Sequence, residues 1–312
     1  MKNFSYLCGA ALALAGCGHK AADPAPAAAV TAAAARTDVF QAAASNGKLA
    51  VAVGGAVAVV TELAGGASRR VELPGTAALI DVASCADGSF AALDFYRKVW
   101  VADAGARTWT PHPLDGGWRP LALTCDLRNQ LWVVGSDTTI ASSADRGATW
   151  TRRDFKEDAM FNSIQFVDAE HGFITGEFGK VYRTKDGGAN WDAAPDIGAD
   201  FYPYAALFTS PREGYVAGLA GAMLRTTDGG DSWSALDNPG ARPQYGLARV
   251  DGAIYSVGMG GSLQRLESTR WVGLGYGQRA PGMLRAITSA GNGKLLIGGA
   301  MGVLAMVPAD VR

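Results

Sequence analysis

Three aspartates at a regular spacing are the first residues in this sequence that could carry chemistry. Asp145, Asp186 and Asp228 each lie in a motif Ser/Thr-x-Asp-x-Gly-x-x-Trp. Two carboxylates that face one cleft can hydrolyse a glycosidic bond. In a hairpin turn, however, an aspartate accepts backbone N–H groups of that turn, and a neighbouring glycine adopts the left-handed conformation. We therefore expect each aspartate to accept hydrogen bonds within its own turn, and none to point into a central pocket.

The complete motifs combine a hydroxyl, a carboxylate, a glycine and a tryptophan. The tryptophan would open the following strand and pack its ring against the sheet. We interpret all of these residues as structural. They are Ser143, Asp145, Gly147, Trp150, Thr184, Asp186, Gly188, Trp191, Thr226, Asp228, Gly230 and Trp233.

Three arginines form a second constellation. Arg183, Arg225 and Arg265 each follow a Gly-x-x-Gly hairpin by three or four residues in successive repeats. Equivalent positions in neighbouring repeats lie side by side, so the guanidinium groups would form an arc suited to a carboxylate-bearing partner. The alternative is that each arginine pairs with a motif acid or a carbonyl next to it. Both interpretations stay open at this point.

Other chemical signals are weak. His112 and His171 have no partners at metal-ligand spacing, and there is no Gly-x-Ser-x-Gly motif or phosphate-binding loop. The sequence thus predicts no catalytic residue, no metal and no cofactor. A net charge of −1 argues against a nucleic-acid partner, which would require a basic surface.

The elements that must position these residues repeat about every forty-one residues. One column of the repeat is tryptophan, with separations of 41, 41, 42 and 38 residues between Trp109, Trp150, Trp191, Trp233 and Trp271. A second column is glycine, at Gly54, Gly135, Gly176, Gly218, Gly258 and Gly298. Around Trp191 the pattern predicts strands near 163–167, 172–176, 180–184 and 190–193. Four short antiparallel strands in each repeat are typical of a propeller blade.

The repeat count predicts an all-β protein, a seven-bladed β-propeller of four-stranded antiparallel blades. No helix longer than two turns is expected within 40–307. The last blade shows three strands before the chain ends, so we expect residues 28–38 or their neighbours to supply its fourth strand. The blades are expected to begin near Phe40, Ala78, Pro120, Phe161, Tyr204, Tyr245 and Met283.

The N-terminus resembles a bacterial lipoprotein signal. Lys2 precedes a short apolar run, which ends in Leu14-Ala15-Gly16-Cys17. The resemblance implies a lipoprotein signal peptide over 1–16, lipid attachment at Cys17 and membrane anchoring through that lipid. Residues 17–37, rich in alanine and proline, would form a tether, and 38–312 would form the propeller. Gly18 after the cysteine favours the periplasmic face of the outer membrane, by analogy with Gram-negative sorting.

Export would leave Cys85 and Cys125 as the thiols of the folded part. Both follow the first strand of their blades, at the same end of adjacent blades. An oxidising compartment favours a disulfide, but the bond needs Cα atoms about 4.4–6.8 Å apart. Blades diverge from the ring axis, so a bridge and two free thiols remain equally open.

The motifs resemble the Asp-box, or bacterial neuraminidase, repeat. The fuller pattern Gly-x-x-Gly-x-x-x-x-Thr-x-Asp-Gly-Gly-x-x-Trp resembles the photosystem II stability and assembly factor family, strongly over 120–236 and more weakly over 40–307. That resemblance implies an exported seven-bladed propeller. It would act as a binding, scaffold or assembly factor for an envelope or membrane protein complex, not as an enzyme.

The alternative is a sialidase-like glycoside hydrolase. A resemblance to sialidases would require a Phe/Tyr-Arg-Ile-Pro motif, which the chain lacks, and three arginines around an acid, which cannot be placed. The sequence does not identify the partner or the face that binds it, nor does it indicate whether any photosynthetic role applies.

Overall fold

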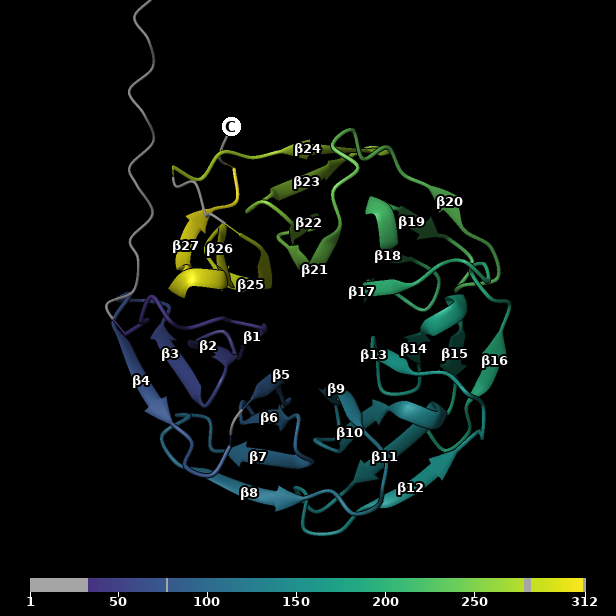
Figure 1. The fold of residues 1–312 in the computed structure, drawn as a ribbon, viewed down its shortest axis with the longest axis horizontal. Helices are drawn as coiled ribbons and strands as arrows, with labels where there is room; N and C mark the ends of the chain where they lie inside the picture. The colour runs from purple at the N-terminus through teal and green to yellow at the C-terminus, as the bar shows by residue number, and fades with distance from the viewer. Residues whose placement is uncertain (1–32, 77, 278–281, 311–312) are drawn as a thin grey trace, which may run out of the picture.

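Seven small β-sheets are arranged in a ring around a central channel (Figure 1). The computed structural model describes residues 33–76, 78–277 and 282–310. Six sheets have four strands and one has three, and each sheet is an antiparallel meander in chain order. The predicted all-β, seven-bladed propeller is therefore confirmed.

The first three blades follow one another along the chain. Blade one contains β1 (Ala42–Ser45), β2 (Leu49–Gly54), β3 (Val57–Glu62) and β4 (Ser68–Glu72). Blade two contains β5 (Leu79–Ser84), β6 (Phe90–Asp94), β7 (Lys98–Ala102) and β8 (Trp109–Pro113). Blade three contains β9 (Pro120–Cys125), β10 (Leu131–Gly135), β11 (Thr139–Ser143) and β12 (Thr151–Asp154).

The remaining four blades complete the ring. Blade four contains β13 (Phe161–Phe166), β14 (Gly172–Gly176), β15 (Val181–Thr184) and β16 (Asp192–Ala194). Blade five contains β17 (Pro203–Phe208), β18 (Gly214–Gly218), β19 (Met223–Thr226) and β20 (Ser234–Ala235). Blade six contains β21 (Gln244–Val250), β22 (Ala253–Gly258), β23 (Leu263–Glu267) and β24 (Arg270–Gly273). Blade seven contains β25 (Leu284–Gly291), β26 (Lys294–Gly299) and β27 (Leu304–Pro308).

The two faces of the ring differ in which turns they carry. Because neighbouring strands are antiparallel, the turns between second and third strands all lie on one face, which we call the tip face. The other turns within each blade lie on the opposite face, which we call the box face because it carries the Asp-box motifs. The described helices are four three-residue 3₁₀ turns of the tip face, η1 (Ser136–Thr138), η2 (Glu177–Gly179), η3 (Leu219–Gly221) and η4 (Ala300–Gly302). None of the helices in the described ranges is long and apolar enough to cross a membrane.

The glycine column has a steric cause at the end of the second strand in every blade except blade two, where Asp94 takes this place. A Cβ added at Gly176 would lie 2.5 Å from the carbonyl oxygen of Met160, which precedes the first strand of the same blade. In blade seven this place belongs to Gly299, which pairs with Leu284, whereas Gly298 pairs with Ala286. The sequence column was therefore one residue out of register in the last repeat.

Cys85 and Cys125 form a disulfide between blades two and three at the box face. Their Cα atoms are 5.1 Å apart and the bond closes a separation of 40 residues. The divergence of the blades does not prevent the bond, because both cysteines lie at the channel-side strands, where neighbouring blades are closest. A loop of this length stabilises the fold by roughly 3–4 kcal/mol in the chain-entropy model.

The described part of the expected closing strand meets blade seven without forming a strand. The described residues 33–38 form a turn, not a strand, because the Asp38 carboxylate accepts the Ala35 N–H at 2.7 Å. This turn meets blade seven at its tip, where Gly302 N–H donates to the Asp38 carbonyl at 2.8 Å. Within the described residues, blade seven keeps three strands. Residues 28–32, the expected signal peptide and Cys17 lie outside the described residues.

Apolar packing seals the same seam between blades seven and one. Its buried cluster brings together residues that are far apart in the sequence, and these are Phe40, Ala50, Ala52, Val59, Ala286, Ala290, Leu296 and Leu304. Phe40 N–H also donates to the Gly299 carbonyl at 3.0 Å. The ring is thus closed by side-chain packing and isolated backbone bonds.

Candidate functional site

The Asp-box residues satisfy one another inside each turn of the box face. In blade four the Thr184 hydroxyl donates to the Asp186 carboxylate at 2.8 Å and accepts the Gly188 N–H at 2.9 Å. The same carboxylate accepts the Asn190 N–H at 2.9 Å. Blades three and five repeat the arrangement around Asp145 and Asp228.

These hydrogen bonds also fix the ionisation of the box carboxylates. The hydroxyl and N–H of Thr149 lower the pKa of Asp145 to about 2, and the N–H and amide of Asn190 lower the pKa of Asp186 to about 2. Bonds from Ser232 hold the pKa of Asp228 well below its ordinary value. The three acids lie in separate turns on separate blades, so they do not supply the paired carboxylates of a glycoside hydrolase.

The three arginines occupy equivalent third strands, but each already has an acidic partner. Arg183 reaches Asp231 in the Asp-box turn of the next blade at 2.8 Å, and Arg225 contacts Glu213 of its own blade at 2.6 Å. Arg265 pairs with Glu267. All three side chains are partly exposed. These acids largely balance the charge of the three arginines, and the use of the arginines in partner binding stays a prediction.

A different set of side chains converges on the central channel. In blades two to seven the register of the first strand shifts by one residue beside the glycine column, which is a β-bulge. A bulge re-aims one side chain without changing the rest of the ladder. The bulged positions, and the corresponding residue of blade one, all line one cavity of about 550 Å³. We call this set the channel collar, and it consists of Gln41, Ile80, Leu121, Asn162, Tyr204, Tyr245 and Arg285.

The channel collar is asymmetric. The guanidinium of Arg285 bonds the Gln41 amide oxygen at 3.0 Å and lies 5.3 Å from the ring centre of Tyr245. The Tyr245 ring is 5.4 Å from that of Tyr204, and Asn162 donates to the Pro203 carbonyl at 3.2 Å. Blades four to seven and one therefore present aromatic, amide and cationic groups, while blades two and three present aliphatic ones.

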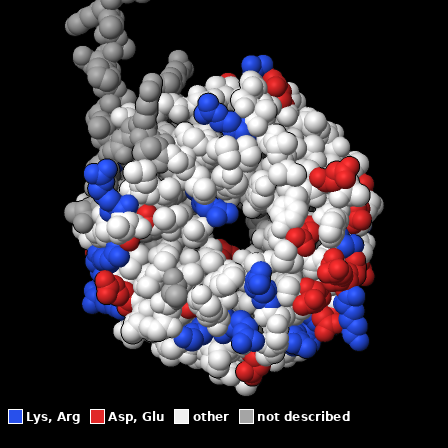
Figure 2. Space-filling model, in the orientation of Figure 1, with Lys and Arg blue, Asp and Glu red and all other residues white. Residues whose placement is uncertain are grey.

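One carboxylate faces the same cavity. Asp81 accepts the backbone N–H of Leu123, on the neighbouring blade, and of Val82, each at 2.8 Å. Burial raises the pKa of Asp81 to about 6, although both hydrogen bonds act in the opposite direction. The first strands start at the tip face, so the cavity lies in the half of the channel nearest that face. Its opening is visible at the centre of the ring in Figure 2.

Sequence reasoning missed the channel collar, although its spacing was visible. Successive members are separated by 39, 41, 41, 42, 41 and 40 residues, the period of the tryptophans. The types vary from isoleucine to arginine, so no residue pattern marks the column. Within the described ranges, no group of three potential metal ligands occurs.

The fold defines this chain as a seven-bladed β-propeller with a lined central channel. The sequence profile of the family described as "Photosynthesis system II assembly factor YCF48" matches residues 150–245. A curated relative, the photosystem II assembly protein Ycf48 of Synechococcus sp. (strain JA-2-3B'a(2-13)), is 40% identical over 57 residues, which are 18% of this chain and 17% of the relative. The resemblance inferred from the repeats is confirmed over these parts of the chain.

Solved structures extend the likeness of the fold to nearly the whole chain. The structure titled "YCF48 bound to D1 peptide" covers 91% of this chain and 96% of its own, at 14% identity and a TM-score of 0.72. A virginiamycin B lyase from Staphylococcus aureus covers 88% and 96%, at 12% identity and a TM-score of 0.73. At such identities only the fold is shared, and the fold hosts both binding proteins and enzymes.

Proposed function

We propose that this chain is an exported, lipid-anchored propeller that binds a segment of a membrane protein and assists the assembly of an envelope complex. The observation that carries the proposal is the match to the assembly-factor family over residues 150–245, within a fold shared with a peptide-bound relative. The lipobox ending in Cys17 supports anchoring at the periplasmic face of the outer membrane. The self-satisfied Asp-boxes favour binding over hydrolysis.

The channel collar is the best place for the bound segment. Its aromatic rings and amides offer contact area and hydrogen bonds together, and both are typical of sites that bind peptides. Arg285 supplies a cation beside Tyr245, so a carboxylate or a polar chain end would be held there. In blades two to seven the collar residues sit on bulges, which turn their side chains toward the channel.

Site-specific photo-crosslinking in intact cells tests this function. A photoreactive residue at Tyr245 is expected to capture one membrane protein, and Arg285→Ala should reduce the yield about fivefold, through the lost charged contact. The matched control places the photoreactive residue at Arg153, which is exposed on outer strand β12. Equal capture at both positions, or none at Tyr245, would refute the proposed function. Mass measurement of the N-terminal peptide reports separately whether Cys17 is acylated.

A further inference from the structure

The exposed apolar side chains of this protein are concentrated on one face. The described residues expose nine large apolar side chains, and the one on the box face is Leu127. The other eight lie at the tip-face turns or just before a first strand, and these are Val39, Phe95, Tyr96, Phe178, Leu219, Met259, Met283 and Met301. Such turns ordinarily carry glycine, asparagine or aspartate. An apolar set at turn positions is therefore unexplained by folding.

Backbone conformation strengthens this observation. Phe178 and Met301 are about half exposed and hold positive φ angles of 59° and 58°. A bulky residue in the left-handed region costs roughly 1–2 kcal/mol relative to glycine. Backbone strain of this kind is typical of functional sites, where the strained side chain makes contacts with a ligand or partner.

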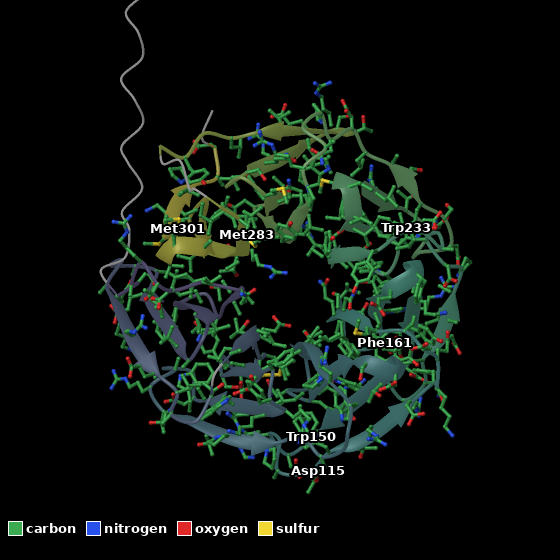
Figure 3. All side chains as sticks on the ribbon, viewed as in Figure 1. Asp115, Trp150, Phe161, Trp233, Met283 and Met301 are labelled. Carbon is green, nitrogen blue, oxygen red and sulfur yellow. A yellow bond between two sulfur atoms is a disulfide. The ribbon has the colours of Figure 1, made fainter. Side chains whose placement is uncertain are left out.

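Four of these side chains adjoin the place where the chain enters the propeller. Met259 and Met283 are joined by an isolated antiparallel bridge between blades six and seven. Met301 lies in the η4 turn of blade seven, whose Gly302 bonds Asp38, and Val39 follows Asp38 directly. Figure 3 labels Met283 and Met301 on this blade. We call Val39, Met259, Met283 and Met301 the entry patch.

We propose that the entry patch rests on the phospholipid bilayer to which the chain is anchored. The tip face is a broad face of the ring. Figure 2 shows it as mostly uncharged over blades six and seven, with basic residues beside the central opening and over blades two and three, and acidic residues gathered over blades four and five. Methionine side chains are flexible and adapt to an irregular apolar surface. The proposal rests on the proposed function only for the lipid at Cys17.

The point of entry favours a membrane over a protein as the occupant. Fifteen residues lie between Cys17 and residue 33, so a fully extended chain between them would reach about 55 Å. Four apolar side chains bind a bilayer weakly when free. A tether that leaves from the same face raises the effective concentration of bilayer beside the patch, so weak contact becomes stable. Docking in this way would also place the channel collar over segments that emerge from the membrane.

A thiol-reactive fluorophore tests the proposal on the exported chain. Cys85 and Cys125 are bonded to each other, so Met301→Cys and Leu127→Cys each supply a new labelling site. In vesicles of phosphatidylethanolamine and phosphatidylglycerol, at about 3:1, the label at Met301→Cys is expected to brighten about twofold. It should also be quenched by nitroxide-labelled lipids. The label at Leu127→Cys should do neither. Equal behaviour of the two labels, or a response at Met301→Cys that requires another envelope protein, overturns the proposal.

A second arm isolates the patch from the anchor. In the mature chain, which begins at position 17 and carries Cys17→Ser, adding Met259→Ser and Met301→Gly should weaken partition into the same vesicles about fivefold. Adding Leu127→Ser should leave partition unchanged. Glycine suits the backbone at position 301, so misfolding does not explain a loss there. An unchanged partition in both variants refutes docking, whatever the acylation of Cys17 or the capture at Tyr245 shows about the proposed function.

Discussion

On the box face of blade four, Thr184, Asp186 and Gly188 satisfy one another's hydrogen bonds within a single turn. On the tip face of blade seven, Met301 occupies a left-handed position and exposes 47% of its side chain. The two turns lie in different blades, but each connects neighbouring strands of the same kind of meander. The first turn has the polar residues and the glycine that turns favour, whereas the second places a bulky apolar residue in a left-handed conformation. In these two turns, hydrogen bonds within the fold account for the residue types on the box face, whereas no contact among the described residues of the fold accounts for a left-handed methionine on the tip face.

The largest expected effect is a difference in stability between glycine substitutions on the two faces. Gly188 has a φ of 89°, and a Cβ there would overlap the Trp132 ring, whereas a Cβ at tip-face Gly260 would meet only the mobile end of Arg242. Gly188→Ala should therefore lower the free energy of unfolding by about 4 kcal/mol, and Gly260→Ala by about 1 kcal/mol. Urea denaturation measures both values. Similar losses in the two variants would remove the contrast between the faces.

A smaller effect of opposite sign is expected at Met301. Met301→Gly relieves the left-handed strain, so it should raise the free energy of unfolding by about 1 kcal/mol. The same variant should bind vesicles less well. Thermal unfolding and vesicle flotation on one preparation check the two halves together. A destabilised variant would show that Met301 packs into the fold and would remove the strain argument.

The smallest expected effect is on the pH dependence of stability, which should differ between a carboxylate of the channel and one of the box face. The pKa of Asp81 is raised from 3.8 to about 6, so the folded state binds the extra proton and its stability declines as pH rises from 4 to 6. Asp81→Asn should flatten this window by about 1 kcal/mol, which is less than the pKa shift alone would give because Asp81 is only partly buried and lines the cavity. The pKa of Asp186 is lowered to about 2, so its contribution is lost only as pH falls from 4 to 2. Unfolding curves at several pH values measure both contributions. If the stability of Asp81→Asn changed with pH between 4 and 6 as much as that of the unmodified protein, the raised pKa of Asp81 would be contradicted.

The structure of a region could be predicted from the sequence only where a motif specifies it. The Asp-box names the residues of a turn and their bonding, so the partners of Asp186 were predictable from the sequence. The channel collar depends on a bulge, which changes the direction of Tyr245 or Arg285 while leaving the strand pattern intact. Register was likewise uncertain in the last repeat, where two adjacent glycines, Gly298 and Gly299, compete for one column. The apolar tips were visible in Gly-x-x-Gly turns, since Phe178 stands where polar residues are usual.

The expected closing strand shows a different limit. Residues 33–38 continue an alanine-rich stretch, and nothing in their types marks the turn that Asp38 imposes. That turn depends on Arg70, whose guanidinium meets the Asp38 carboxylate at 2.6 Å from a strand of blade one. An ion pair between residues 32 positions apart in the sequence therefore holds this turn, and single-sequence reasoning could not anticipate it.

This turn has a mechanical consequence. A pull on the chain ahead of residue 33 acts on the seam between blades seven and one, while the disulfide locks a different seam, between blades two and three. A pulling force reaches Asp38 before it reaches the sheet. Asp38 contacts Ala35, Arg70 and Gly302 at the same time. Asp38 therefore distributes a pulling force between blade one, through Arg70, and blade seven, through Gly302, before the force reaches β1.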